Sequence, residues 1–215
     1  MNARTKPFIN IWPYITIIGI MIYVAIDILL AHLRPDYSLL HNAESDYGRG
    51  QYFWLMDINF LLRCGFSLSL VKNLRTYFPK NSAIRKASYW LIIWAITSGL
   101  LAFFADNPYG YTHLASGSIH LLLAFIAFIA VIVGIIQISR LLDHEAKWHT
   151  ISVVLRVVSV LSIVAILFLG RAGFKPHGLG GLYERIFLGL VLAWQLIVSI
   201  KLHEVGESTK SSLNN

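Results

Sequence analysis

The sequence predicts an all-α, polytopic membrane protein: a bundle of six transmembrane helices with both termini in the cytoplasm. Of its 215 residues, 56% are hydrophobic and 13% are charged, which is about half the charge of an ordinary soluble domain. The apolar residues are also clustered in blocks, several of which approach the roughly 20 residues that a helix needs to cross a bilayer. This composition excludes intrinsic disorder, a collagen-like repeat and a conventional soluble enzyme.

Six apolar segments, each closed by charged residues, proline or glycine, form the expected single domain of residues 1–205. They cover residues 12–31, 52–71, 89–105, 119–138, 151–170 and 186–202, and residues 206–215 form a polar C-terminal tail. Helices are the expected form, because backbone amides in hydrocarbon must be paired within the segment. The roughly ten-residue stretches of alternating polarity that are typical of a transmembrane β-barrel are absent.

Taken in order, the segments differ in what flanks or interrupts them. Arg4 and Lys6 precede the first, as in a signal peptide, but its apolar stretch is too long and no small-x-small cleavage site follows, so we expect a helix that is retained. The second carries Arg63 within its apolar run. The third ends directly before Asp106, and the fourth is almost wholly apolar. Arg156 lies a turn or two inside the fifth, from where it can reach the cytoplasmic surface, and the sixth ends before the polar tail.

Lysine and arginine indicate the orientation, because they concentrate at the cytoplasmic ends of transmembrane helices. With the N-terminus inside, eleven of the eighteen basic residues lie on the cytoplasmic side, five lie outside and two lie within segments. We therefore expect both termini in the cytoplasm. The net charge of +7 follows these helix ends rather than one basic surface, so we expect membrane lipids and no nucleic acid as partners.

Ionisable side chains are costly inside a bilayer, so their depth is informative. Apart from the groups at the cytoplasmic ends, they gather in the non-cytoplasmic third of the predicted bundle. A loop of about twenty residues between the first two segments contributes many of them, and a loop of that length is more often functional than merely connecting. The acids and histidines on this side are Asp27, His32, Asp36, His41, Glu44, Asp46, Asp57, Asp106, His113, His120, His177 and Glu184.

Arg63 is the deepest of the charged residues. It follows Tyr52 by eleven residues, which places it roughly 16 Å into the bilayer. An arginine at this depth must point into the bundle and find a partner. Asn59 lies four residues earlier on the same helix face, whereas Asp57 is rotated away. We expect the partner of Arg63 to be a carboxylate from another helix, and Asp27 is the candidate. The alternative is a purely structural ion pair that fixes helix packing.

The residue types on this side include those of a metal site. Zinc takes imidazole and carboxylate ligands, and a catalytic site keeps one position open for water. Asp106, His113 and His120, joined by Asp46 or Asp57 from elsewhere, have the required atoms. No HExxH or comparable pair is present to support a divalent metal such as zinc.

Two kinds of metal-free chemistry are open as well. Asp27, Asp57 and Glu184 offer paired carboxylates for acid–base work in a desolvated cleft. Three serines at the same level could act as nucleophiles beside a histidine, although none has the Gly-x-Ser-x-Gly context of a hydrolase. These serines are Ser45, Ser116 and Ser118.

Three stretches form recognisable motifs: His41-Asn42-Ala43-Glu44-Ser45-Asp46-Tyr47-Gly48, Phe103-Phe104-Ala105-Asp106 with Gly117-Ser118-Ile119-His120, and Gly181-Leu182-Tyr183-Glu184-Arg185-Ile186. They resemble a bacterial and archaeal membrane family known as domain of unknown function 998 (DUF998). The chain departs from the family at Tyr47, where leucine is usual, and at Glu184, where glutamine is common. The resemblance implies this architecture in the cytoplasmic membrane of a prokaryote, and a site but no reaction.

The Ser-Asp-x-Gly element is also similar to one in the eukaryotic family of the glycosylphosphatidylinositol lipid-remodelling factor. More loosely, serine, aspartate and histidine near one membrane face resemble the alkaline ceramidase and adiponectin-receptor hydrolase superfamily. Both resemblances imply lipid chemistry, so the first hypothesis is an intramembrane hydrolase or lipid-modifying enzyme acting on an amphiphile. Its catalytic residues are expected to be Asp46, Asp106, His120, Glu184 and Arg185, and its substrate-binding residues Asn42, Ser45, Asp57, Asn59 and Arg63.

Two further hypotheses come from other functional classes. A small-molecule or proton-coupled transporter would use the deepest groups, Asp27, Asp57 and Arg63, but the sequence places few polar residues in the cytoplasmic half. A non-enzymatic sensor or assembly subunit would use the long outer loop as its contact surface. Replacing Asp46 or His120 would leave such a scaffold working, whereas a catalytic site needs both.

Overall fold

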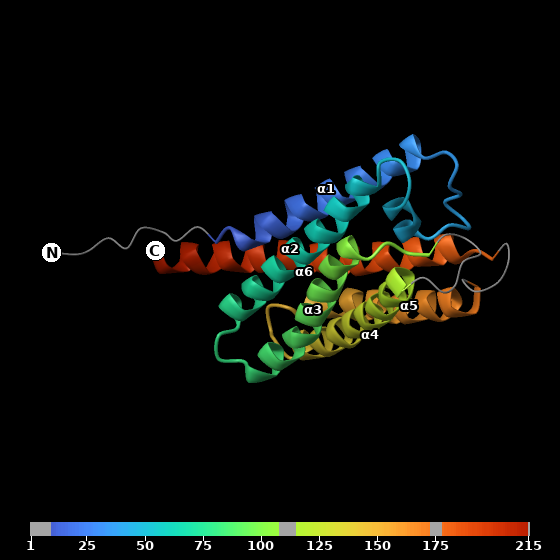
Figure 1. Ribbon diagram of the computed structural model, residues 1–215. Coiled ribbons are helices and arrows are strands. Elements are labelled where there is room, and N and C mark those ends of the chain that lie inside the picture. Colours follow the sequence, from blue (N-terminus) through green and yellow to red (C-terminus); the bar gives the residue numbers. More distant parts are fainter. Residues whose placement is uncertain (1–9, 108–114, 173–177, 215) are drawn as a thin grey trace.

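The computed structural model describes residues 10–107, 115–172 and 178–214, and the regular secondary structure in these ranges is all helical (Figure 1). Six helices among the described residues are long and apolar enough to cross a membrane, so the all-α prediction of a multi-pass membrane protein is confirmed. The helices are α1 (Trp12–Leu33), α2 (Phe53–Tyr77), α3 (Ser82–Leu100), α4 (Ala115–Asp143), α5 (His149–Ala172) and α6 (Gly180–Asn214), with short 3-10 turns η1 (Glu44–Gly48) and η2 (Leu101–Phe103).

The helices extend beyond the apolar segments because their polar ends also form helical turns. At the start of α3, the side chain of Asn81 accepts a hydrogen bond of 3.0 Å from the backbone N–H of Ile84, which caps a helix beginning seven residues before the predicted Tyr89. The last helix continues past Leu202 through the polar tail to Asn214. Hydropathy therefore located the membrane-spanning cores, and capping by Asn81 explains where α3 begins.

The start of α1 and the end of α6 lie at the same end of the bundle (Figure 1). Contacts between side chains support this arrangement: the Tyr14 hydroxyl lies 3.4 Å from Nε2 of His203, and the Asn10 amide donates to Asn73 Oδ1 at 2.8 Å. The loop that carries η1, the end of α3 and the starts of α4 and α6 share the opposite end. Which of the two ends is cytoplasmic stays a prediction.

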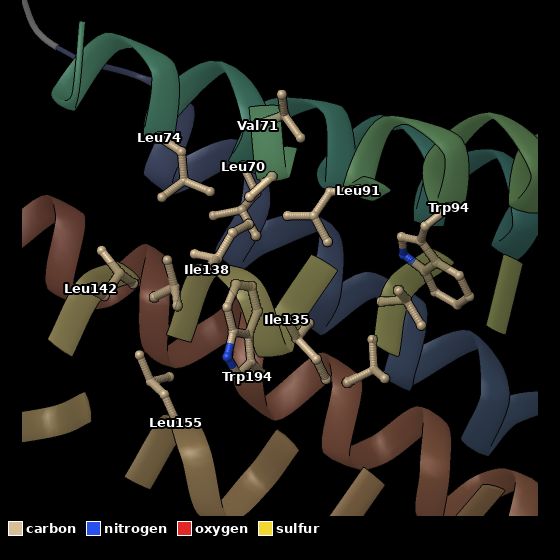
Figure 2. Close-up of a cluster of buried hydrophobic side chains, with 14 of the residues drawn as sticks. Leu70, Val71, Leu74, Leu91, Trp94, Ile135, Ile138, Leu142, Leu155 and Trp194 are labelled. Carbon is tan, nitrogen blue, oxygen red and sulfur yellow. The ribbon is translucent and has the colours of Figure 1, made fainter. Parts of the chain in front are cut away.

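A buried hydrophobic cluster joins α2, α3, α4, α5 and α6, and Figure 2 shows part of it, with leucines and isoleucines near Trp94 and Trp194. Both tryptophans satisfy their indole N–H groups inside the core: Trp94 donates to Ser67 Oγ at 3.1 Å, and Trp194 donates to Ser139 Oγ at 2.8 Å. Lipid tails are as apolar as these side chains, so close packing and such hydrogen bonds stabilise the helix contacts.

Close packing is most demanding where α3 crosses α4 at Gly134. A Cβ atom at this position would lie 3.0 Å from Leu91 Cδ2 and 3.2 Å from Trp90 Cβ. The absence of a side chain therefore lets the two helix backbones approach, as small residues do at other membrane helix crossings.

We predict that Gly134→Val lowers the free energy of unfolding by about 1–3 kcal/mol, because the added methyl groups force α3 and α4 apart. Thermal unfolding of the purified protein in detergent measures the effect. Gly65→Val is the matched control, since a Cβ at Gly65 meets nothing within 4 Å. Equal melting temperatures for the two variants would contradict the close crossing.

The orientation can be tested with single cysteines in a Cys64→Ser background. Asp36 lies in the first loop with a side chain 60% exposed, and Lys147 is exposed between α4 and α5 at the other end. With both termini in the cytoplasm, a membrane-impermeant maleimide labels Asp36→Cys in intact cells and labels Lys147→Cys only after lysis. The reverse pattern would invert the orientation predicted from the basic residues.

Candidate functional site

A cavity of about 540 Å³ opens at the end of the bundle that carries η1. One part of its wall is polar and comes from the first loop, the segment after η2, and the first turns of α4 and α6. The rest is apolar and comes mainly from α4 and α5. The polar part includes Glu44, Ser45, Asp46, Asp106, His120 and Glu184, and the apolar part includes Leu121, Phe125, Ile129, Ile166 and Leu169.

The turn η1 holds Asp46 in the cavity wall by local hydrogen bonds. Its Oδ2 accepts from the backbone N–H of Ala43 at 3.0 Å and from the Asn42 amide at 3.2 Å, and its Oδ1 pairs with the Arg49 guanidinium. Arg49 also donates to the backbone carbonyl of Asn107, which ties the first loop to the segment after η2. Burial raises the pKa of the Asp46 carboxyl, and the Arg49 charge and the Asn42 hydrogen bond oppose this shift.

Glu184, in the second turn of α6, receives the first loop directly. Its Oε2 accepts a hydrogen bond of 2.8 Å from the backbone N–H of Glu44, and both side chains are buried. The neighbouring Arg185 donates from Nη1 to the carbonyl oxygens of Leu39 at 3.1 Å and Asn42 at 2.7 Å. Arg185 therefore fastens the loop backbone to α6.

Gly181 allows this close docking of the loop on α6. A Cβ at this position would lie 2.1 Å from the carbonyl oxygen of Asn42 and 2.9 Å from that of Leu39, which is too close for any other residue. The backbone N–H of Leu182 donates to the carbonyl of Leu40 at 3.1 Å. The first turn of α6 therefore holds the loop over the cavity.

Arg63 is linked to the first loop through Tyr23 of α1. The Tyr23 hydroxyl donates to Glu44 Oε1 and accepts from Arg63 Nη1 at 3.2 Å, so one buried hydroxyl joins the two charges. The guanidinium also lies over the rings of Trp94, at 4.9 Å, and Phe60, at 5.2 Å.

The prediction that Asp27 pairs with Arg63 is wrong, because Arg63 makes no ion pair among the residues that the structure describes. Asp27 is half-buried on α1 and lines no part of the cavity. Asn59 donates from its amide to the backbone carbonyl of Tyr23, at 3.2 Å, and so supports the α1–α2 contact.

His120 is fixed by the chain that precedes α4. Its Nδ1 lies 2.7 Å from the carbonyl oxygen of Phe104, and its ring packs edge-on against Phe60 at 6.0 Å. A carbonyl oxygen only accepts, so Nδ1 carries the proton and Nε2 is the nitrogen of the neutral ring that can accept one. A buried histidine in this tautomer is a candidate general base.

The structure brings six of the predicted site residues together around the cavity: Ser45, Asp46, Arg63, Asp106, His120 and Glu184. The remaining described ones lie outside it. Arg185 and Asn42 hold the loop, Asn59 binds backbone, and Asp57 is half-buried elsewhere on α2. His113 lies outside the described residues.

The predicted zinc site gains no support from this geometry. Within residues 10–107, 115–172 and 178–214, no group of three or more histidine, cysteine, aspartate or glutamate residues is arranged to hold a metal ion. Asp46 instead directs its two oxygens to Arg49, Asn42 and the Ala43 N–H, and His120 uses Nδ1 on a backbone carbonyl.

The sequence analysis missed three residues that shape the site. Tyr23 and Arg49 were not singled out, and Glu44 was placed on the predicted non-cytoplasmic side without a role. Local spacing contains a signal for two of them, because Glu44 lies two residues before Asp46 and Arg49 lies three residues after it; Tyr23 has no such signal. Spacing of this kind shows proximity but not which oxygen each group contacts.

Comparison with known protein families matches residues 17–201 to the family described as "Protein of unknown function (DUF998)". No curated protein matches the chain, and no solved structure does. The matched range contains every described residue that lines the cavity.

We predict that Tyr23→Phe lowers the free energy of unfolding by about 1–3 kcal/mol, because it leaves the buried Glu44 carboxylate and the Arg63 guanidinium without their shared hydroxyl. Thermal unfolding in detergent measures the loss. Tyr89→Phe is the matched control, since Tyr89 is 54% exposed on α3. If both variants melt with the wild type, the link between Glu44 and Arg63 contributes nothing.

Proposed function

Since the chain belongs to the DUF998 family of membrane proteins, as its sequence motifs indicated, we propose an activity from its cavity: that of a lipid-modifying enzyme, a hydrolase of a lipid or similar amphiphile. The observation that carries this proposal is a single cavity with two chemically different parts. Buried carboxylates and a histidine line one part, and leucine, isoleucine and phenylalanine line the other. An amphiphile has the same division between head group and chain.

The apolar part also faces the lipid. Leu121, Phe125 and Ile129 line the cavity and are 52%, 65% and 45% exposed on the surface of α4. In a bilayer these side chains contact lipid tails, so a hydrocarbon chain can pass from the membrane into the cavity without crossing water. The volume of about 540 Å³ suits a ligand of modest size.

The polar residues supply the two proton transfers of hydrolysis. His120 Nε2 takes a proton from water as the water oxygen forms its bond to the reacting carbonyl carbon or phosphorus of the substrate. The bond to the leaving oxygen then breaks, and that oxygen takes a proton from a cavity carboxylic acid. Asp46 is the candidate for this acid, because it lines the cavity and burial raises the pKa of its carboxyl.

A transport function has less support, because the cavity ends partway through the bundle. Its lining residues on α2 extend only to Arg63, those on α4 extend to Ile129, and those on α5 begin at Ile166. Of the three deep groups proposed for a transporter, Asp27, Asp57 and Arg63, only Arg63 lines it. With the orientation expected from the basic residues, the cavity opens on the non-cytoplasmic side of a prokaryotic cytoplasmic membrane.

Reconstitution tests the proposal. The purified protein is placed in nanodiscs made from a total bacterial lipid extract, and the lipid classes are followed by mass spectrometry. We expect the wild type to deplete one class and release its hydrolysis product. His120→Gln and Asp46→Asn should reduce the rate at least about 100-fold, the scale of a lost acid–base group.

Asp36→Asn is the matched control for these variants, because Asp36 lies in the same loop with its carboxylate exposed and directed at Arg34, outside the cavity. Its rate should equal that of the wild type. The proposal is wrong if the wild type changes no lipid class, or if His120→Gln retains the full rate while folded.

A further inference from the structure

We infer, on the basis of the proposed function, that the amphiphile bears a cationic head group, an ammonium, and that its single hydrocarbon chain lies between α4 and α5. The inference rests on the charges that line the cavity and on the contacts that already satisfy some of them. It also rests on the Nε donor of Arg63, which has no acceptor among the described residues, and on the open space beside Gly170.

The cavity wall is acidic. Its lining includes four carboxylates, on Glu44, Asp46, Asp106 and Glu184, and one guanidinium, on Arg63. Arg49 and Arg185 are close in sequence to these acids but line no part of the cavity. Arg49 contacts Asp46 and the carbonyl of Asn107, and Arg185 donates from Nη1 to loop carbonyls. An anionic head group would meet several carboxylates and a single arginine.

Two of the four carboxylates are compensated by protein cations. Asp46 pairs with Arg49, and Glu44 reaches Arg63 through the hydroxyl of Tyr23. Because these two protein cations already interact with acids, they repel a cationic ligand at the polar end less strongly.

The other two carboxylates have no ion pair within the described part of the chain. Glu184, 8% exposed, accepts the backbone N–H of Glu44, and Asp106 accepts the backbone N–H of Asn107 at 2.7 Å. A charge held inside a bundle, such as that of the buried Glu184, is costly unless an opposite charge is near. Asp106 is half-buried, and an ammonium in the cavity would supply an opposite charge to both acids.

Arg63 gives an independent indication of a ligand. Its side chain is 3% exposed and lines the cavity, and its Nε has no hydrogen-bond acceptor among the described residues. A hydroxyl or ester oxygen next to the ammonium would accept from it. The head group that fits both Arg63 and the acids is therefore an amino alcohol or an amino ester.

The chain site follows from the apolar wall. Leu121 and Ile129 are eight residues apart on α4, so this wall extends for about 12 Å along the helix. Gly170 of α5 also lines the cavity, and a Cβ placed there meets nothing within 4 Å. A larger residue at Gly170 fits the helix and takes up space that the hydrocarbon chain would need.

Two single-chain probes of equal length test the charge of the head group: dodecylamine and dodecyl phosphate. Each is titrated into purified protein in nanodiscs of uncharged lipid, and binding is measured by native mass spectrometry and by the shift in melting temperature. We expect dodecylamine to bind at least about tenfold more tightly, the ratio that corresponds to 1.4 kcal/mol. Glu184→Gln should remove most of this preference, and Asp36→Asn should keep it.

The chain site is tested by Gly170→Leu, which should weaken both probes about tenfold or more. Gly189→Leu is the matched control, because Gly189 lies on α6 outside the cavity and a Cβ there also meets nothing within 4 Å. If both probes bind equally, or the phosphate binds better, and Gly170→Leu weakens both, the cationic head group is wrong and the amphiphile site stands. If neither probe binds the wild type, or Gly170→Leu changes neither, the cavity is not an amphiphile site and the proposed function fails with it.

Discussion

The hydrogen bond from the backbone N–H of Glu44 to the Glu184 carboxylate joins the first loop to the last helix, and the polar end of the cavity depends on it. The two residues are 140 positions apart in the chain and both are buried. A carboxylate inside a bundle needs donors, and the loop backbone supplies one because Arg185 and Gly181 hold it against α6. Without this docking, Ser45 and Asp46 would not line the cavity.

The same requirement for partners explains the arrangement deeper in the bundle. Glu44 is satisfied by the Tyr23 hydroxyl, and that hydroxyl in turn accepts from Arg63. Aromatic rings complete the surroundings of the guanidinium, as far as the described residues go, so this deep arginine is held by α1, α2 and α3 together. A cluster of buried charges of this kind rigidifies one end of the bundle while the cavity beside it stays open between α4 and α5.

The predictability of the site differs from residue to residue. Depth placed Asp46, Asp106, His120 and Glu184 with eight other acids and histidines at the predicted non-cytoplasmic end, and the family resemblance covers the stretches that contain these four. All four line the cavity. Depth did not separate Glu184 from its neighbour Arg185, whose guanidinium turns to backbone carbonyls. Tyr23 could not be distinguished from a tyrosine packed against lipid, because its role consists of contacts to residues from other parts of the chain.

The sequence by itself determined the membrane class, the six spanning helices and the gathering of acids and histidines at one end. These properties are local: a segment spans a bilayer because of its own length and hydropathy, and its backbone is paired within itself. Tertiary structure alone decided that Arg63 contacts Tyr23 rather than Asp27, and which acids share a cavity. Those outcomes depend on how each helix is rotated and packed against its neighbours, and helix rotation is set by contacts between residues far apart in the chain.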